Sequence, residues 1–181
     1  MDSKLLKIDQ NSLPVKKVER LERSLTSFVT ALSKTNDNPA DLSWVKYKMS
    51  LDIKSVVKEP AFLKDLSVLH GDRLIQIIAL AIERECDDLN FNSNLSPGQV
   101  LELSAMIVEG WPYETLEDIL MAFKAFKQGK LSINISKLFK FSIPDAMNIL
   151  NAYLVEVKAP ELESHNKTKH IEENESHLKC Y

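Results

Sequence analysis

Residues 115–140 read TLEDILMAFKAFKQGKLSINISKLFK, and they hold the clearest helix signal in the chain. Thr115 and Asp118 form a capping pair, because each side chain can bond a backbone amide that the first helical turn leaves free. Apolar residues then recur at spacings of three and four and fall within an arc of about 120°. They are Leu116, Ile119, Leu120, Phe123 and Phe126. Gly129 ends the pattern, so an amphipathic helix is predicted from residue 115 to residue 129.

The segments on either side predict further helices. Apolar stripes with helical spacing occur in five other stretches. These are residues 14–33, 60–69, 73–89 and 97–110, and a stretch from Ser142 to the Ala159-Pro160 pair. All four glycines lie beside predicted helix ends, and the alternating pattern of a half-buried strand is missing. We therefore predict an all-α fold, a compact bundle of about six helices, with the helix at 73–89 central because it is apolar on nearly all sides.

Residues 41–58 fit both a helix and a strand. Apolar residues at helical spacing compete there with others at the alternating spacing of a strand. The first set is Leu42, Val45, Met49, Ile53 and Val56, and the second is Leu51, Ile53 and Val57. We predict a helix, and the strand remains an alternative.

Three aromatic side chains are candidates for contact with a partner protein, because aromatic residues dominate interface energetics. Trp44 and Tyr47 lie three residues apart in the ambiguous segment, where half-buried core aromatics are the commoner interpretation. Trp111 precedes Pro112, which restricts its backbone and makes a stiff connector. We expect Trp111 to wedge between two helices, and all three aromatics remain candidate protein contacts.

The composition indicates one globular domain followed by a polar tail. The chain has 181 residues, of which 44% are hydrophobic, enough for a core without disulfides or a metal. We predict a single helical domain over residues 1–160. Residues 161–181 have few apolar side chains and no usable period, so a disordered polar tail is predicted there.

The cysteines and the apolar runs bear on location. Cys86 and Cys180 lie far apart and form no CxxC pair, which favours a reducing compartment. The first residues show no run typical of a signal peptide, and no stretch approaches the roughly 20 apolar residues needed to cross a bilayer. We therefore expect a cytoplasmic protein with no membrane partner. The formal net charge of -3 excludes a globally basic nucleic-acid binder, but it leaves room for a local basic patch.

No pattern of catalytic residues is present. The sequence offers no nucleophile with a paired base, no phosphate-cradling glycine loop and no carboxylate set at metal spacing. The tail histidines and cysteine (His165, His170, His177 and Cys180) match no compact zinc pattern, so a solvated tail is the better interpretation. We therefore predict a protein that is not an enzyme, with no catalytic residue, no metal site and no cofactor.

Five lysines and no acidic residue occur between Ile119 and Pro144, although the chain as a whole is acidic. They are Lys124, Lys127, Lys130, Lys137 and Lys140. Basic residues interleaved with phenylalanines are typical of single-stranded nucleic-acid binding, but lysines at a helix end also complement the macrodipole. Lys127 falls inside the apolar arc, so its ammonium must either snorkel from the last turn or bond exposed carbonyls. The five lysines are candidate contacts for nucleic acid or for a partner protein.

Residues 95–156 carry a longer pattern: a capped helix, an aromatic connector, a helix ending in a Lys-bearing glycine turn, and a final helix with a tyrosine. The residues of this pattern are Leu95, Ser96, Gln99, Tyr113, Leu116, Asp118, Ile119, Phe123, Lys127, Gly129, Lys130, Ile149 or Leu150, and Tyr153. In them the chain resembles a family of small helical proteins carried by phages and mobile elements of gut bacteria. The linker LSINISKLF departs from the family pattern, which usually has a second glycine and a tyrosine there. The genomic company of the family implies accessory roles in replication or transfer of an element's DNA.

We therefore expect a non-enzymatic accessory protein of a phage or mobile element in a bacterial host cell. The acid-free lysine segment and the resemblance together favour a role in DNA replication or a related nucleic-acid transaction, through DNA or a replication protein. A protein partner is expected, with nucleic acid as a further candidate. The alternative is a structural or adaptor protein, including a virion component, that works only through protein–protein contacts.

Overall fold

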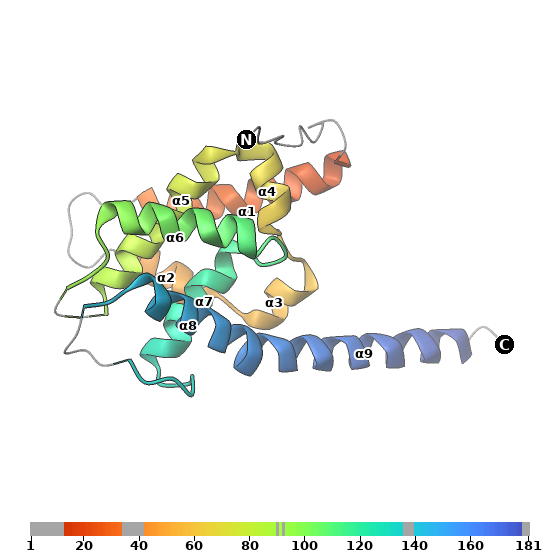
Figure 1. Cartoon of the computed structure of the whole chain (residues 1–181). Helices are drawn as coiled ribbons and strands as arrows, with labels where there is room; N and C mark the ends of the chain where they lie inside the picture. Colours follow the sequence, from red (N-terminus) through yellow and green to blue (C-terminus); the bar gives the residue numbers. More distant parts are fainter. Residues whose placement is uncertain (1–12, 34–41, 90, 92, 136–139, 179–181) are drawn as a thin grey trace, which may run out of the picture.

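The computed structural model describes residues 13–33, 42–89, 91, 93–135 and 140–178. These residues form an all-α structure, which confirms the predicted all-α class, although they contain more α-helices than the about six that were predicted (Figure 1). The helices are α1 (Val15–Ser33), α2 (Leu42–Ser50), α3 (Ile53–Lys58), α4 (Leu63–His70), α5 (Asp72–Asp87), α6 (Pro97–Gly110), α7 (Leu116–Lys127), α8 (Ile143–Tyr153) and α9 (Ala159–Leu178). A π-helical turn, η2 (Leu154–Lys158), joins α8 to α9. Within the described ranges the extended pairings are two isolated bridges, Phe62 with Thr115 and Ser93 with Lys140.

Three helices begin with a capping box at the places where the sequence predicts a helix start. The caps of α6, α7 and α8 are Ser96, Thr115 and Ser142, with Gln99, Asp118 and Asp145 as their partners. In each box the cap side chain accepts from the amide three residues later, and the later side chain accepts from the amide of the cap. These bonds join residues close together in the chain, so the local sequence specifies where the three helices begin.

α7 lies at the centre of the bundle, and α5 packs beside it with one side exposed (Figure 1). α7 packs against α2, α3, α5 and α8, while α5 packs against α1, α4, α6 and α7. The predicted stripe of α7 is buried at Leu116, Ile119, Leu120 and Phe123, and Phe126 is half-buried. Met121, Ala122 and Ala125 are buried as well. α7 is therefore covered on more sides than its amphipathic pattern predicts, because neighbours pack on it from several directions.

The segment 41–58 contains two short helices where one was predicted. α2 and α3 are separated at residues 51–52, and Asp52 has an extended backbone that starts the second helix. The helical prediction is confirmed within the described part of this segment, while the prediction of one continuous helix is wrong. Asp52 lies at this interruption, and its side chain accepts a hydrogen bond from the hydroxyl of Ser55 in the first turn of α3.

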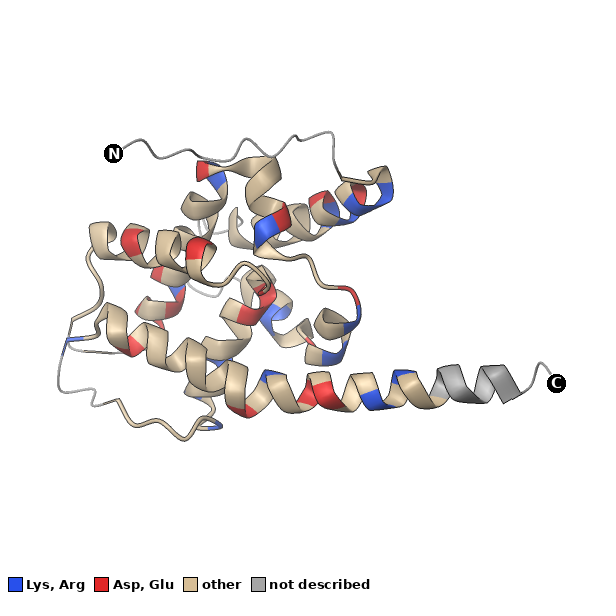
Figure 2. Ribbon diagram, turned by 45° about the vertical axis from the view of Figure 1, so that its right-hand side comes forward, with Lys and Arg blue, Asp and Glu red and all other residues tan. Residues whose placement is uncertain are grey.

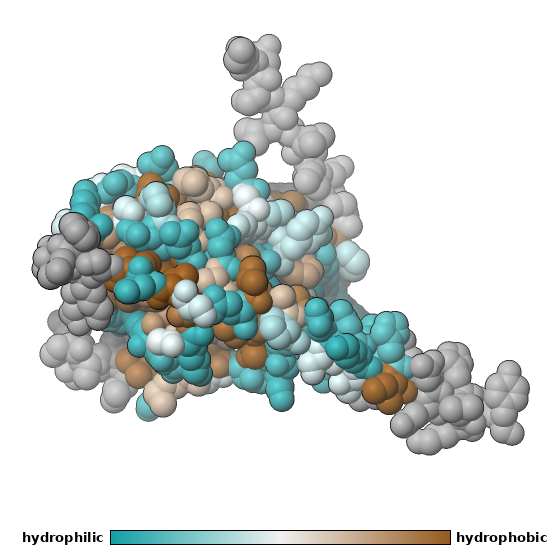
Figure 3. Space-filling model, turned by 60° about the horizontal axis from the view of Figure 1, so that its bottom comes forward, coloured by the Kyte–Doolittle hydropathy of each residue, from teal (hydrophilic) through white to brown (hydrophobic). Residues whose placement is uncertain are grey.

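The predicted disordered tail is not supported, because residues 161–178 continue in helix α9, while residues 179–181 lie outside the described part of the chain. Pro160, expected to end the preceding helix, lies in the first turn of α9, and the helix continues through it although it has no N–H to donate to the preceding turn. The amide of Ala159 bonds the carbonyl of Leu154, five residues back, so the helix passes through a widened turn. α9 projects from the body, and its surface over residues 159–171 is mainly hydrophilic (Figures 1 and 3).

Candidate interaction surfaces

The lysines at the end of α7 have different environments. Lys124 Nζ donates to the carbonyl oxygen of Lys48 at 2.9 Å, and Lys127 Nζ lies 2.9 Å from a carboxylate oxygen of Glu85. Lys130 and Lys140 are exposed, whereas Lys137 lies outside the described residues. Two of the five predicted contact residues are thus held by other groups of the same chain, and two described lysines face solvent.

Glu85 explains why Lys127 lies in the apolar arc of α7. Its side chain is 0% exposed and accepts from Trp44 Nε1 at 3.2 Å, from Lys48 Nζ at 2.7 Å and from Lys127 Nζ at 2.9 Å. Burial lowers the pKa of Lys127, but the carboxylates of Glu85 and Asp88 outweigh it, so the pKa lies above its ordinary value. Lys127 therefore snorkels to a buried carboxylate that binds α2, α5 and α7 together.

The sequence does not single out Glu85, although a signal for it exists. Glu85 follows Ile78 by seven residues and Ile82 by three, which places a carboxylate on the buried side of α5. Lys127 likewise lies within the apolar stripe of its own helix, α7. Opposite charges on two buried stripes indicate a pair, but only the packing of the helices decides that these two stripes face one another.

A second buried polar cluster joins α7 to the π-helical turn. Asp118 accepts from the hydroxyl of Tyr153 at 3.0 Å and from the ammonium of Lys158 at 2.6 Å, in addition to its capping bonds with Thr115. Lys158 also donates to Glu114. Burial, followed by the charges of Asp118 and Glu114, raises the pKa of Tyr153, which keeps its hydroxyl protonated as a donor. These bonds join groups of the chain itself and hold the last helices against α7.

The candidate contact aromatics lie in or against the core. Trp44 is 1% exposed, and its ring meets that of Phe28 edge-on at a centroid distance of 5.8 Å. Tyr47 stacks on Trp44, and its hydroxyl lies 3.4 Å from a carboxylate oxygen of Glu117. Both are core aromatics, the commoner interpretation of their spacing, and neither presents an exposed anchor to a partner. Trp111 is half-buried at the end of α6 and also packs against the core.

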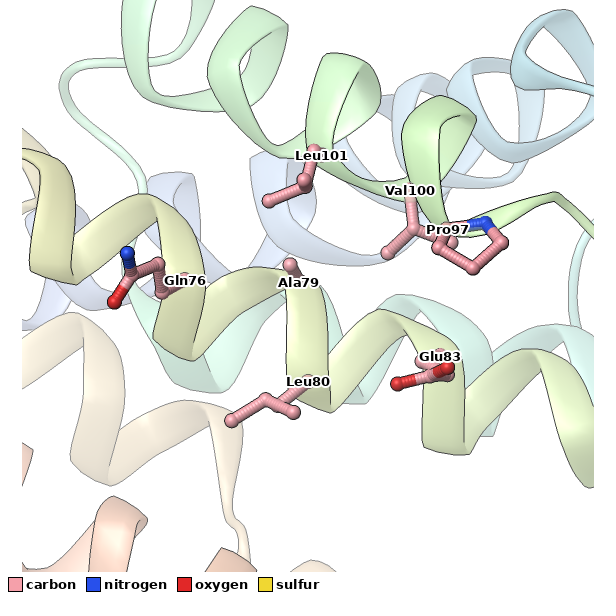
Figure 4. Close-up of a pocket in the computed structure, with 7 residues that line it drawn as sticks. All are labelled: Gln76, Ala79, Leu80, Glu83, Pro97, Val100 and Leu101. Carbon is pink, nitrogen blue, oxygen red and sulfur yellow. The ribbon is translucent and has the colours of Figure 1, made fainter.

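An open apolar groove lies between α5 and α6 (Figure 4). α5 contributes Gln76, Ala79, Leu80 and Glu83, and α6 contributes Pro97, Val100 and Leu101. The groove has a volume of about 270 Å³. Ala79 and Val100 are buried, whereas Leu80 is 55% exposed and Leu101 is 48% exposed. Two large apolar side chains on neighbouring helices are thus left for water or for a partner to cover.

The groove arises from the apolar character of both helices. Leu80 is two residues from Ile78 and from Ile82, about 200° around the helix, so the packing that buries these isoleucines turns Leu80 outward. Leu101 is related to the buried Leu103 in the same way. The sequence predicts that the helix at 73–89, which is α5, is surrounded by other helices. One side of α5 is buried as predicted, but the apolar side that carries Leu80 is exposed.

Comparison of the chain with protein-family models, with curated proteins and with solved structures gives no match. Among the described residues, no group of His, Cys, Asp or Glu side chains is placed to hold a metal ion. The described helices also include none with the length and apolar content needed to cross a bilayer. The groove and the exposed Lys130 and Lys140 are features on which a function can be proposed.

Proposed function

We propose that this protein is a non-enzymatic adaptor that binds a partner protein through the groove between α5 and α6. The observation that carries the proposal is the exposure of Leu80 and Leu101 on the two walls of one apolar groove. Covering the exposed part of one leucine contributes about 1 kcal/mol, so the two together can anchor a partner. The area around the groove would supply the rest of the interface.

The titratable groups support binding rather than catalysis. Burial raises the pKa of Cys86 to about 12, which keeps its thiol protonated and unreactive at neutral pH. Burial likewise raises the pKa values of Tyr47 and Tyr153, and none of these three side chains lines the groove. A site that binds through apolar contacts needs no such groups near it.

The proposal can be tested by capture of partners with matched variants. Tagged wild type is compared with Leu80→Glu/Leu101→Glu and with Met49→Glu in extracts of the native cells. Met49 is 74% exposed on α2, so the control places one Glu, against two in the double variant, at an exposed apolar position away from the groove. A specific partner should be retained by wild type and by Met49→Glu and lost by the double variant. Equal recovery of every partner by all three proteins would refute the groove as the binding surface.

A second candidate function is an accessory role in replication or transfer of the DNA of a phage or mobile element, in the cytoplasm of a bacterial host. The exposure of Lys130 and Lys140 and the resemblance in residues 95–156 support it. Two phosphate contacts give a log–log dependence of binding on salt with a slope of about -1.8, at about 0.9 per contact. Lys130→Ala/Lys140→Ala should abolish that dependence. Failure of the wild type to bind DNA at low salt would exclude this function.

A further inference from the structure

We infer that the occupant of the α5–α6 groove is an amphipathic helix of a partner protein, with Lys or Arg residues beside its apolar stripe. This inference rests on the proposed function, because it assumes that the groove binds protein. The form of the groove, the side chains that line it and the charges around it carry the inference.

The form of the groove favours a helix over other peptide conformations. An added β-strand needs an open sheet edge, and the described part of this chain contains no sheet. A polyproline segment needs a groove lined by aromatic rings, and none of the residues lining this groove is aromatic. A third helix can lay side chains at spacings of three and four between Leu80 and Leu101, as helices pack ridges into grooves elsewhere.

The charges around the groove are acidic. Glu83 lines the groove itself, and Asp87 is exposed one turn further along α5. On α6, Glu102 is exposed next to Leu101, and the helix contains no Lys or Arg over its whole length (Figure 2). The exposed leucines of the groove, with carboxylates beside them, therefore favour a partner helix whose apolar stripe has Lys or Arg residues beside it. Attraction between these opposite charges would also speed association.

The two cations of α5 leave this acidic character in place. Arg73 lies seven residues, about two turns, before Leu80, as far from it as Asp87, and it is exposed beside the carboxylate of Asp72 at the beginning of the helix. The guanidinium of Arg84 lies over the ring of Trp44, 5.1 Å from its centroid, on the side that faces α2. The same carboxylates disfavour the anionic occupants, a nucleic-acid backbone and an anionic membrane surface, by like-charge repulsion.

A selection experiment tests the inference directly. A displayed library of peptides about 16 residues long, long enough for four helical turns, keeps leucines at helical spacing and varies the other positions among Lys, Glu, Gln and Ser. Peptides that bind the full chain are then measured against Leu80→Glu/Leu101→Glu and against Met49→Glu. A groove binder is one that loses at least about tenfold in affinity with the double variant and keeps its affinity for Met49→Glu.

The expected result is that groove binders are enriched in Lys over Glu. Glu83→Gln/Glu102→Gln should then weaken the best binder by about two- to fivefold per charge removed and reduce its salt dependence. Groove binders that are neutral or acidic would overturn the basic helix while leaving the docking function intact. The absence of any groove binder would overturn the docking function itself. A dimer in light scattering that the double variant abolishes would show that the occupant is a second copy of this chain.

Discussion

Replacing Lys127 by Met separates a structural role of this lysine from a ligand-binding one. Met keeps most of the apolar stem and removes the ammonium that lies 2.9 Å from Glu85. Removing one partner of a buried ion pair costs about 3–5 kcal/mol when the other charge is left alone. Here Lys48 and Trp44 continue to donate to Glu85, and the Lys127 side chain is itself 25% exposed. We therefore expect the free energy of unfolding to fall by about 1–3 kcal/mol.

Urea denaturation followed by far-ultraviolet circular dichroism measures this change. Lys130→Met is the matched control, because Lys130 is exposed after the end of α7 and its loss should change stability by less than about 0.5 kcal/mol. In a double-mutant cycle, Lys127→Met and Glu85→Gln should show a coupling energy of about 1–2 kcal/mol. A wild-type unfolding free energy for Lys127→Met, with no coupling to Glu85, would refute the buried pair and return Lys127 to the candidate ligand contacts.

The remaining predictions concern stability. Folding raises the pKa values of Tyr153 and Cys86, so the folded chain holds these two protons more tightly than the unfolded chain does. The resulting contribution to the free energy of unfolding is complete when the pH is below the ordinary pKa values, which are 10.0 for Tyr153 and 9.0 for Cys86. Stability should fall as pH rises above that range, and less steeply for Tyr153→Phe; urea midpoints from about pH 8 to about pH 11 check this, and equal slopes would contradict it. Gly129 has a φ of 66°, so Gly129→Ala should cost about 1 kcal/mol in the same assay, and no loss would rule out that strain. Leu103 is 0% exposed, and Leu103→Ala should cost about 2–5 kcal/mol, whereas Leu101→Ala should cost about 0.5 kcal/mol or less; equal losses would show that Leu101 is a core residue.

Features that depend on near neighbours in sequence could be predicted from the sequence alone. The caps at Ser96 and Thr115 bond amides three residues away, so their geometry is contained in a few consecutive residues. The buried stripe of α7 follows from helical periodicity, which is also local. The all-α class follows from the sum of such local signals. The prediction that Phe123 lies in the apolar stripe of its helix is confirmed by its complete burial.

Features that depend on which helices meet required the tertiary structure. Whether Lys127 is a ligand contact or an ion-pair partner depends on the distance to Glu85, which lies 42 residues earlier in the chain. The same dependence explains Leu80, because a helix that is apolar on nearly all sides does not reveal which side its neighbours leave uncovered. In the last part of the chain the polar composition of residues 161–181 predicts disorder, but the structure continues from α8 through a π-helical turn into helix α9. The sequence determined the helices of this protein, because helix signals are local. Packing determined the ion pair of Lys127 with Glu85 and the groove between α5 and α6, because contacts between helices join residues far apart in the chain.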